Sequence, residues 1–376
     1  MTPLEFPAAD RRGRVEAVAA RAAEVPLDVL VVSHPSNVRW AVGFTGSNGT
    51  LVLRQGSVAL LTDARYRDQA PAELADAGLA GIVQVVEVPS GADGEAVWRT
   101  LLGPSGRVGL EATEVSWATV RELSRIAPGV EFVPTVGLVE AGRSCKDAAE
   151  VARIAAAAGA VDRGFWSLTS LIDGARSEIE IARALDAAIV DAGADGPAFP
   201  TIVASGPNGA LPHARPTDRV VGIDDVVVVD VGAVVDGYRS DMTRTICLGS
   251  PDPEAMVVWE LVAAAQAAGR AAVREGAVVS AVDLAARSVI EGAGLGERFT
   301  HGTGHGVGLD VHEAPSIPRS GGVPLEIGHV LTVEPGVYLP GRFGVRIEDT
   351  VVVTPDGCRS LTGFPIVLRP TRSDRP

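Results

Sequence analysis

The sequence predicts an α/β N-terminal domain over residues 1–140 and an α+β C-terminal domain with an antiparallel sheet over residues 141–376. The chain has 376 residues, 46% of them hydrophobic, which is more than one typical domain needs. Strand-type and helical segments alternate in the first part, as in layered α/β domains. In the second part the helices are grouped and the strands occur in hairpins. The pattern changes around Val136–Lys146.

The N-terminal elements are expected in a regular order. A helix over Arg11–Val25 precedes the apolar strand Leu27–Ser33, with its Val-rich centre. Further along we expect strands at Thr50–Arg54 and Ser57–Asp63, a helix at Arg67–Ala77, a strand at Ile82–Val88, a helix beginning in "SGADGEAVWRT" and a strand at Arg107–Ala112.

The C-terminal half begins with an Ala-rich helical region from Asp147 to about Leu171. Ser177 and Glu180 have the spacing of a capping box, so a second helix should begin there and run to about Ala192. The remaining expected elements are a strand-rich block over Phe199–Cys247, helices over Glu254–Glu275 and Ala281–Gly292, and a final set of strands interrupted by Gly and Pro.

Composition excludes several classes of function. The formal net charge of −14 disfavours nucleic acid and anionic membrane surfaces, which attract clustered Lys and Arg. The three widely spaced cysteines suggest neither a disulfide framework nor a Cys-type zinc site. No signal-peptide pattern is visible, and the longest apolar stretches fall far short of the roughly 20 residues that cross a bilayer. We therefore expect a soluble cytoplasmic protein.

A hairpin in "VVVVDVGAVVDGYRSDMTRT" carries two aspartates on one face. Asp236-Gly237 is a strong two-residue turn signal. With this turn as the register, the facing pairs are Val235–Tyr238, Gly232–Asp241 and Asp230–Thr243. Asp230 and Asp241 then lie diagonally on one face, with Cα atoms about 7–8 Å apart, and Gly232 leaves the space between them clear.

Two carboxylates inside an apolar hairpin need compensation. Burial without a partner would cost several kcal/mol or force protonation. A divalent cation between the two would resolve the conflict. A solvent-facing pair at a sheet edge, or an Asp that caps a turn, is the plain alternative.

Two glutamates repeat this pattern near the C-terminus. Glu334 ends the apolar strand "VLTVE", and Glu348 lies inside "GVRIEDTVVV", which reads as one strand. Arg346, Glu348 and Thr350 share a face of that strand. A structural ion pair between Arg346 and Glu348 is the alternative reading.

The stretch "THGTGHGVGLDVHEAP" contains three of the chain's six histidines and four glycines. One histidine can bind a metal while the others face a substrate, and the glycines would let the main chain pass close to the metals. No helix follows to support a dinucleotide fingerprint, and "HEAPS" is not the zincin H-E-x-x-H. Histidines serving as ordinary core or cap residues remain an alternative.

The acidic residues and histidine together favour a dinuclear metal site. Two Asp and two Glu carry a charge of −4, which two divalent ions would balance, as in sites where metals lie ~3.5–4 Å apart. Imidazole and carboxylate without thiolate suit Mn, Co, Fe or Zn.

The ordered set of Asp230, Asp241, "GTGHGVGLDVHEAP", "TVEPGVY" and "VRIEDT" resembles the M24 "pita-bread" metallopeptidases, which include methionine aminopeptidase, aminopeptidase P and prolidase. "SGPNGALPHARPTDR" is similar to the family's substrate-histidine segment. The first 140 residues, with "NVRWAVGFTGSNG" and "LLTDARYRDQA", resemble the creatinase-type N-terminal domain. The resemblance is closest to bacterial Xaa-Pro peptidases of the prolidase and aminopeptidase P type.

The resemblance implies a role for each matching residue. The implied metal ligands are Asp230, Asp241, His305, Glu334 and Glu348, with Asp241 and Glu348 shared between two ions, Mn before Co or Zn. His213, His301 and His312 match substrate-facing histidines, and Tyr338 and Arg346 match supporting positions. Glu334 would also move a proton to the departing nitrogen, which adds it to the catalytic set with the three histidines.

The implied reaction is hydrolysis of the bond between an N-terminal residue and a following proline. A metal-free, creatinase-like amidinohydrolase and a non-enzymatic binding module are the alternatives, and the five intact ligands argue against both. Dipeptidase and aminopeptidase remain open, since either Arg215 or a loop of the N-terminal domain could restrict substrate length. Trp40 can be core or part of a partner's pocket. The resemblance also implies a homodimer.

Overall fold

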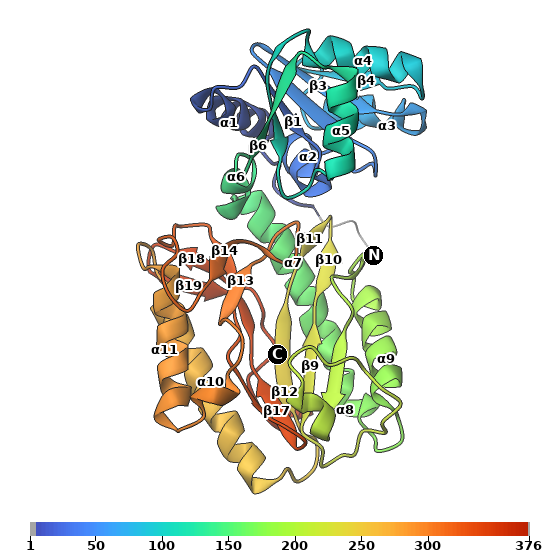
Figure 1. Ribbon diagram of the computed structural model, residues 1–376. Helices are drawn as coiled ribbons and strands as arrows, with labels where there is room; N and C mark the ends of the chain where they lie inside the picture. Colours follow the sequence, from blue (N-terminus) through green and yellow to red (C-terminus); the bar gives the residue numbers. More distant parts are fainter. Residues whose placement is uncertain (1–4, 375–376) are drawn as a thin grey trace. The chain divides into compact units, whose positions relative to one another are not determined.

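The computed structural model describes residues 5–374 and contains two compact units (Figure 1). One unit spans Ala8–Arg143. The other begins at Ser144 and includes residues 5–7. Within residues 5–374, no helix is both long and apolar enough to cross a membrane.

The N-terminal unit is built on a mixed sheet of six strands. In sheet order these are β4 (Val83–Glu87), β3 (Ser57–Thr62), β2 (Thr50–Arg54), β1 (Val29–Val32), β5 (Gly106–Glu111) and β6 (Val130–Thr135). Strand β2 runs antiparallel to both neighbours, whereas the other pairs are parallel. All of β1 is buried, because both faces of the sheet are covered.

The helices of this unit are α1 (Arg11–Glu24), α2 (Pro35–Val42), α3 (Gln69–Asp76), α4 (Ala92–Leu102), α5 (Trp117–Ile126) and α6 (Glu140–Ser144), which ends at the boundary. Helix α2 is not among the elements expected from the sequence. Its Pro35 occupies the first helical turn, where the missing N–H is harmless. Trp40 of α2 is buried, with the Arg14 guanidinium 4.9 Å from its ring centroid.

The second unit combines five α-helices with short antiparallel sheets. Its helices are α7 (Ala148–Phe165), α8 (Leu168–Leu171), α9 (Glu178–Asp191), α10 (Pro253–Ala272) and α11 (Val279–Gly292). Three sheets hold the strands that matter for the site. The first contains β8 (Ile202–Ser205), β9 (Val227–Val231) and β12 (Met242–Ile246); the second contains β14 (Glu313–Ile317), β13 (Gly304–Gly306), β15 (Val330–Val333), β18 (Asp349–Thr354) and β19 (Gly357–Ser360); the third pairs β16 (Gly336–Leu339) with β17 (Phe343–Arg346).

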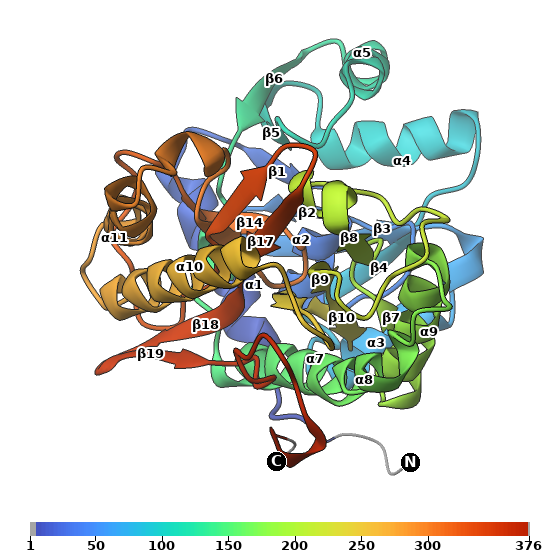
Figure 2. The same cartoon turned by 90° about the horizontal axis from the view of Figure 1, so that it is seen from below.

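Two helix groups pack on the strands of this unit. Helices α7, α8 and α9 share a core with β8, β9 and β12, and β10 (Ala233–Val235) joins them beside β7 (Gly196–Pro197) and β11 (Tyr238–Arg239). Helices α10 and α11 share cores with β14 to β18. In Figure 1, α10 and α11 lie to the left of the strands and α8 and α9 to the right, and the two groups remain separate when the view is turned (Figure 2). Apolar side chains thus fill the contacts between each helix group and the strands.

The capping box of α9 is confirmed, since the Ser177 and Glu180 side chains each accept from the other's backbone N–H. The predicted helical region from Asp147 to about Leu171 is confirmed and consists of two helices, α7 and α8, which are separated at Trp166–Ser167. One element prediction was wrong. The predicted strand "GVRIEDTVVV" is two strands, because β17 pairs with β16 whereas β18 pairs with β15. Glu348 lies in the gap between them.

Candidate metal centre

Nine of the ten predicted site residues line one cavity of about 430 Å³. They are Asp230, Asp241, His305, Glu334, Glu348, His213, His301, His312 and Arg346. The tenth, Tyr338, is buried beside them and reaches the site through hydrogen bonds. Phe199, Ile202 and Val311 add an apolar wall. The cavity is thus polar at one side and apolar at the other, as ligand sites usually are.

The two aspartates come from the predicted hairpin. Its register is confirmed where Asp230 pairs with Thr243 and Val235 with Tyr238. Asp230 lies on β9 and Asp241 directly before β12, so both project into the cavity. The prediction for Gly232 was wrong, because a Cβ there would meet the Ser240 carbonyl oxygen at 2.2 Å and not the space between the carboxylates.

The two glutamates reach the same cavity from the ends of strands. Glu334 directly follows β15. Glu348 is 2% exposed, its N–H donates to the Thr243 carbonyl at 3.0 Å, and its Oε2 accepts from the Thr243 hydroxyl at 2.7 Å. The break between β17 and β18 therefore allows Glu348 to form hydrogen bonds with Thr243 of β12.

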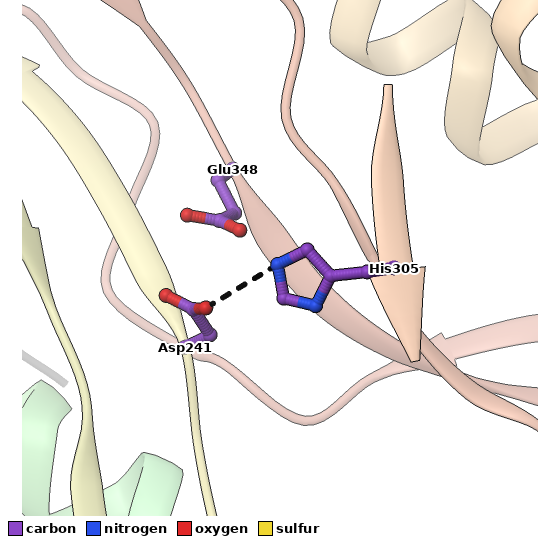
Figure 3. Close-up of side chains that lie close together, drawn as sticks. All are labelled: Asp241, His305 and Glu348. Atoms are coloured by element: carbon purple, nitrogen blue, oxygen red, sulfur yellow. Dashed lines mark ion pairs between the residues drawn. The ribbon is translucent and has the colours of Figure 1, made fainter. Parts of the chain in front are cut away.

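Asp241, His305 and Glu348 form the tightest group. One ligand atom from each lies within 4.8 Å of the others (Figure 3). His305 Nε2 is 3.7 Å from an Asp241 oxygen and 3.6 Å from a Glu334 oxygen. Asp230 is held differently, because its Oδ2 accepts from Arg346 at 2.6 Å. That contact replaces the Arg346–Glu348 ion pair that the sequence left open.

The tautomer of His305 is fixed by its neighbour. Nδ1 lies 3.1 Å from the Gly306 carbonyl oxygen, which can only accept, so Nδ1 carries the proton. Burial and then the nearby His312 lower the pKa of His305 to about 4, so the ring is neutral at neutral pH. Nε2 therefore presents a lone pair to carboxylate oxygens. Acceptors that face one another repel unless a cation lies between them.

The carboxylates are likewise in an unfavourable environment, because they are buried close to one another. Burial, followed by Glu348, Asp230 and Glu334, raises the pKa of Asp241 well above its usual value. Burial, followed by Glu334 and Asp230, does the same for Glu348, and burial raises the pKa of Glu334 to about 7. The buried Oδ1 atoms of Asp230 and Asp241 have no hydrogen-bond partner. These residues fit divalent cations, which would satisfy both the orphaned oxygens and the charge.

The predicted supporting and substrate-facing residues form a second cluster. Arg346 donates to Tyr338 Oη at 2.9 Å and to the Pro212 carbonyl at 3.0 Å. His301 Nδ1 lies 2.8 Å from the Gly302 carbonyl, so Nε2 accepts from the Tyr338 hydroxyl at 2.9 Å. Burial and then Arg346 lower the pKa of His301 to about 4. The cluster holds a neutral imidazole at the cavity wall.

His312 and His213 complete the cavity. The His312 ring packs edge-on against His305, with centroids 4.2 Å apart. His213 follows Pro212 in a segment without strand pairing. The structure therefore places all eight predicted histidines and carboxylates around one cavity, and His305 is the histidine that faces Asp241 and Glu334.

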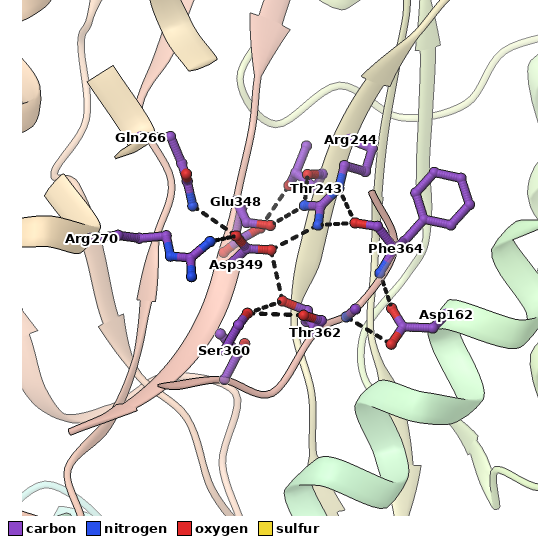
Figure 4. A network of polar contacts seen from close by, with 12 residues as sticks. Asp162, Thr243, Arg244, Gln266, Arg270, Glu348, Asp349, Ser360, Thr362 and Phe364 are labelled. Carbon is purple, nitrogen blue, oxygen red and sulfur yellow. Dashed lines mark hydrogen bonds and ion pairs between the residues drawn. The ribbon is translucent and has the colours of Figure 1, made fainter. Parts of the chain in front are cut away.

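A buried polar network behind Glu348 was missed by the sequence analysis (Figure 4). Asp349 accepts from Arg244 at 2.7 Å and from Arg270 at 3.0 Å, and it also accepts from Gln266 and Thr362. Arg244 donates in addition to the Glu348 carbonyl. Arg244 and Arg270 hold the pKa of Asp349 below its ordinary value despite burial. The only sequence signal was the doubled acid of "RIEDT".

The glycines of the histidine stretch have a different role from the predicted one. A Cβ at Gly304 would lie 2.0 Å from the Thr332 carbonyl oxygen, so glycine permits strand β13 to approach β15. Close approach to the metals is not what requires it.

Gly304→Ala should therefore lower the free energy of unfolding by about 2–3 kcal/mol, because β13 and β15 would have to separate. Urea denaturation measures this effect. Gly292→Ala is the matched control, since a Cβ there meets nothing within 4 Å. Equal stability of the two variants would contradict the packing role of Gly304.

Comparisons with known proteins agree with this geometry. Residues 152–355 match metallopeptidase family M24, and residues 14–145 match the creatinase/prolidase N-terminal domain. The chain is 33% identical over 347 residues to an uncharacterized peptidase of Bacillus subtilis, covering 91% of this chain and 95% of that protein. It is 31% identical over 339 residues to the Xaa-Pro dipeptidase of Pyrococcus furiosus, covering 90% and 94%.

Solved structures extend the likeness to the fold. The Xaa-Pro dipeptidase from Bacillus anthracis gives a TM-score of 0.90 at 33% identity, covering 96% of this chain and 99% of that one. The X-Pro aminopeptidase from Thermotoga maritima gives 0.84 at 34% identity, covering 93% and 99%. The predicted fold class is confirmed. The chain belongs to metallopeptidase family M24, with a creatinase-type N-terminal domain.

Proposed function

We propose that this protein is an Xaa-Pro peptidase, which hydrolyses the bond between an N-terminal residue and a following proline with the help of two divalent metal ions. The similarity to Xaa-Pro dipeptidases over nine-tenths of the chain supports the reaction. The observation that carries the metal proposal is the His305 lone pair directed at the oxygens of Asp241 and Glu334, 3.7 and 3.6 Å away.

Five residues would hold the ions. Asp241 and Glu348 are proposed to contact both, Asp230 one of them, and His305 and Glu334 the other. When bound, such ions lower the pKa of a water and polarise a carbonyl oxygen. The four carboxylates, once deprotonated, balance the charge of two divalent cations. Manganese is our first candidate, with cobalt or zinc as alternatives, because the nitrogen and oxygen donors suit all three.

The remaining residues would bind and orient the peptide. His312 or His213 would donate to the scissile carbonyl oxygen as negative charge develops there. His301 would line the proline side of the cavity. It is held by Tyr338, which Arg346 holds in turn. Proline has no N–H, so a wall that offers no acceptor for one can select its ring.

Glu334 is our candidate for carrying a proton to the departing nitrogen. Its carboxylate lines the cavity beside His305, 3.6 Å from Nε2, where a carboxyl group can accept and donate a proton during the reaction. Glu334→Gln should reduce kcat by about 10²-fold or more while the chain still folds. Steady-state kinetics at matched metal content measure this. Full turnover by the variant would remove Glu334 from proton transfer.

The length of the accepted peptide can be decided by one experiment. After loading with Mn, Co or Zn, the rates of Ala-Pro and Ala-Pro-Ala hydrolysis are compared. Exclusive cleavage of Ala-Pro would mark a dipeptidase, and cleavage of both an aminopeptidase. Cleavage of neither, with every metal, would refute the proposed function. Activity that survives exhaustive chelation would instead favour a metal-free hydrolase.

We also propose a homodimer in the cytoplasm. The dimer follows from the family resemblance, and sedimentation of the metal-loaded protein tests it. The compartment is suggested by three thiols that are all free.

A further inference from the structure

One buried side chain accepts hydrogen bonds from both ends of the segment that carries His213. After β8 ends at Ser205, the chain forms the 3-10 turn η2 (Gly206–Ala210) and then runs without strand pairing to residue 219. Pro212 and His213 of this segment line the cavity. Few regular hydrogen bonds fix its position, so its geometry depends on side chains.

Glu178, the first residue of α9, supplies these contacts and is fully buried. Its Oε1 accepts from the backbone N–H and the hydroxyl of Ser205, both at 2.7 Å. Its Oε2 accepts from the backbone N–H of Thr217 at 2.9 Å, from the Thr217 hydroxyl at 2.7 Å and from Asn208 at 2.8 Å. One carboxylate therefore joins the start of the segment to its end.

The backbone of α9 strengthens the same attachment. The N–H of Glu178 donates to the Arg219 carbonyl at 3.0 Å, and that of Ile179 donates to the Thr217 carbonyl at 3.2 Å. Arg219 in turn forms a two-pronged ion pair with Asp225, at 2.7 and 2.9 Å, and donates to the Ser205 hydroxyl. The unpaired stretch between Ser205 and Thr217 is thus closed into a loop at its base.

Helix packing does not explain this carboxylate. The other buried side chains of α9, such as Ile181 and Leu185, are apolar and join the core. A buried carboxylate is costly unless hydrogen bonds satisfy it, and all five donors that satisfy Glu178 come from the His213 segment and its ends.

We propose that Glu178 is a positioning residue, which sets the place of His213 in the cavity and acts on substrate only through that histidine. This inference rests on the proposed function. In Glu178→Gln, the amide nitrogen must face a backbone N–H, either of Ser205 or of Thr217, so one end of the loop is released. Displacement of His213 should lower kcat/KM by about 10- to 100-fold, since errors near 1 Å cost that much.

A double-mutant cycle tests the proposal with metal-loaded protein and Ala-Pro as the probe. Glu178→Gln, His213→Ala and the double variant are compared. If Glu178 acts through His213, adding Glu178→Gln to His213→Ala should change kcat/KM by less than about twofold, whereas independent sites would multiply their effects. Multiplied effects, or full kcat/KM in Glu178→Gln, would overturn the proposal.

Two controls separate positioning from a general structural role. Glu180→Gln removes an exposed carboxylate from the same helix turn, which contacts Ser177 and not the His213 segment. It should retain the wild-type kcat/KM. Amide hydrogen exchange should rise across residues 206–216 in Glu178→Gln only, with metal content unchanged. Exchange that rises throughout the unit would also contradict the proposal.

A milder variant covers the case in which Glu178→Gln fails to fold. Thr217→Val keeps the side-chain shape and removes one hydroxyl, which donates to Glu178 and accepts from the Arg219 N–H. It enters the same cycle with His213→Ala, and the same criteria apply. Absence of Xaa-Pro cleavage by the unaltered, metal-loaded protein is a separate result, because it refutes the proposed function before any variant is compared.

Discussion

Replacing Glu348 with glutamine should abolish turnover and leave a folded protein. Glutamine keeps the length of the side chain and can still accept from the Thr243 hydroxyl, which lies 2.7 Å from Glu348 Oε2. It cannot supply the negative charge that a shared cation needs. We expect kcat/KM to fall by about 10³-fold or more, because cations of this kind contribute several kcal/mol to transition-state stabilisation. Bound metal, measured by elemental analysis, should fall as well.

The same substitution should make the metal-free protein more stable at pH 8. Burial raises the pKa of Glu348 well above its ordinary value, so ionisation at high pH favours the unfolded chain. The neutral amide removes this penalty. Thermal unfolding after chelation measures the effect, with the exposed Glu275→Gln as control. An inactive variant that is less stable than the wild type would indicate that Glu348 serves the fold and not the metals.

The stability of the metal-free protein should fall as pH rises from 6.5 to 8.5. In the unfolded chain the carboxyls of Asp241, Glu334 and Glu348 are already ionised in this range, whereas in the folded chain their raised pKa values retain protons. The folded state then binds more protons, so the free energy of unfolding decreases with pH. For Glu334, whose pKa is raised from 4.5 to about 7, most of this loss occurs below pH 7, so Asp241 and Glu348 should contribute most of the change between pH 6.5 and 8.5.

The histidines act in the opposite direction but over a lower range. His301 and His305 have pKa values lowered to about 4, so their contribution to stability rises with pH between about 4 and the ordinary value of 6.5. Above pH 6.5 that contribution is complete, so the carboxyl effect can be measured there without it, whereas below pH 6.5 the two effects overlap.

Added metal should reverse the loss, since cations bind the deprotonated carboxylates. The rise in Tm on adding manganese should be larger at pH 8.5 than at pH 6.5, by roughly 5 °C or more. Thermal scans of chelated and loaded protein at the two pH values measure it. A metal-induced gain that does not change with pH would contradict the assignment of these carboxyls as ligands.

The hairpin with Asp230 and Asp241 could be predicted from sequence because its register follows from local rules. The Asp236-Gly237 turn and the two-residue period fix which side chains share a face. The same rules failed at Glu348. The strand-like pattern of "GVRIEDTVVV" does not reveal that Val345 pairs with β16 while Val351 pairs with β15. Which partner a strand chooses is a tertiary property.

The residues that support the site could not be predicted from the sequence for a related reason. Glu178 lies 39 positions from Thr217, and Asp349 lies 83 from Gln266 and 105 from Arg244. No periodicity links such distant positions. The role of Gly304 was also misread, because the atom that excludes a side chain there belongs to Thr332, on a neighbouring strand. Sequence patterns thus indicated the chemistry of the ligands better than the way the chain holds them.

The network of Figure 4 connects a segment near the C-terminus with the buried residues next to Glu348. The Thr362 hydroxyl donates to Asp349 at 2.8 Å. The Phe364 carbonyl accepts from Arg244, and the Phe364 N–H donates to Asp162 of α7. These residues lie beyond position 355, where the match to family M24 stops. A protein shortened before Ser360 would keep every proposed metal ligand and every histidine. It would lose the hydrogen bonds of Thr362 and Phe364 that hold the network next to Glu348, the residue that both cations are proposed to share.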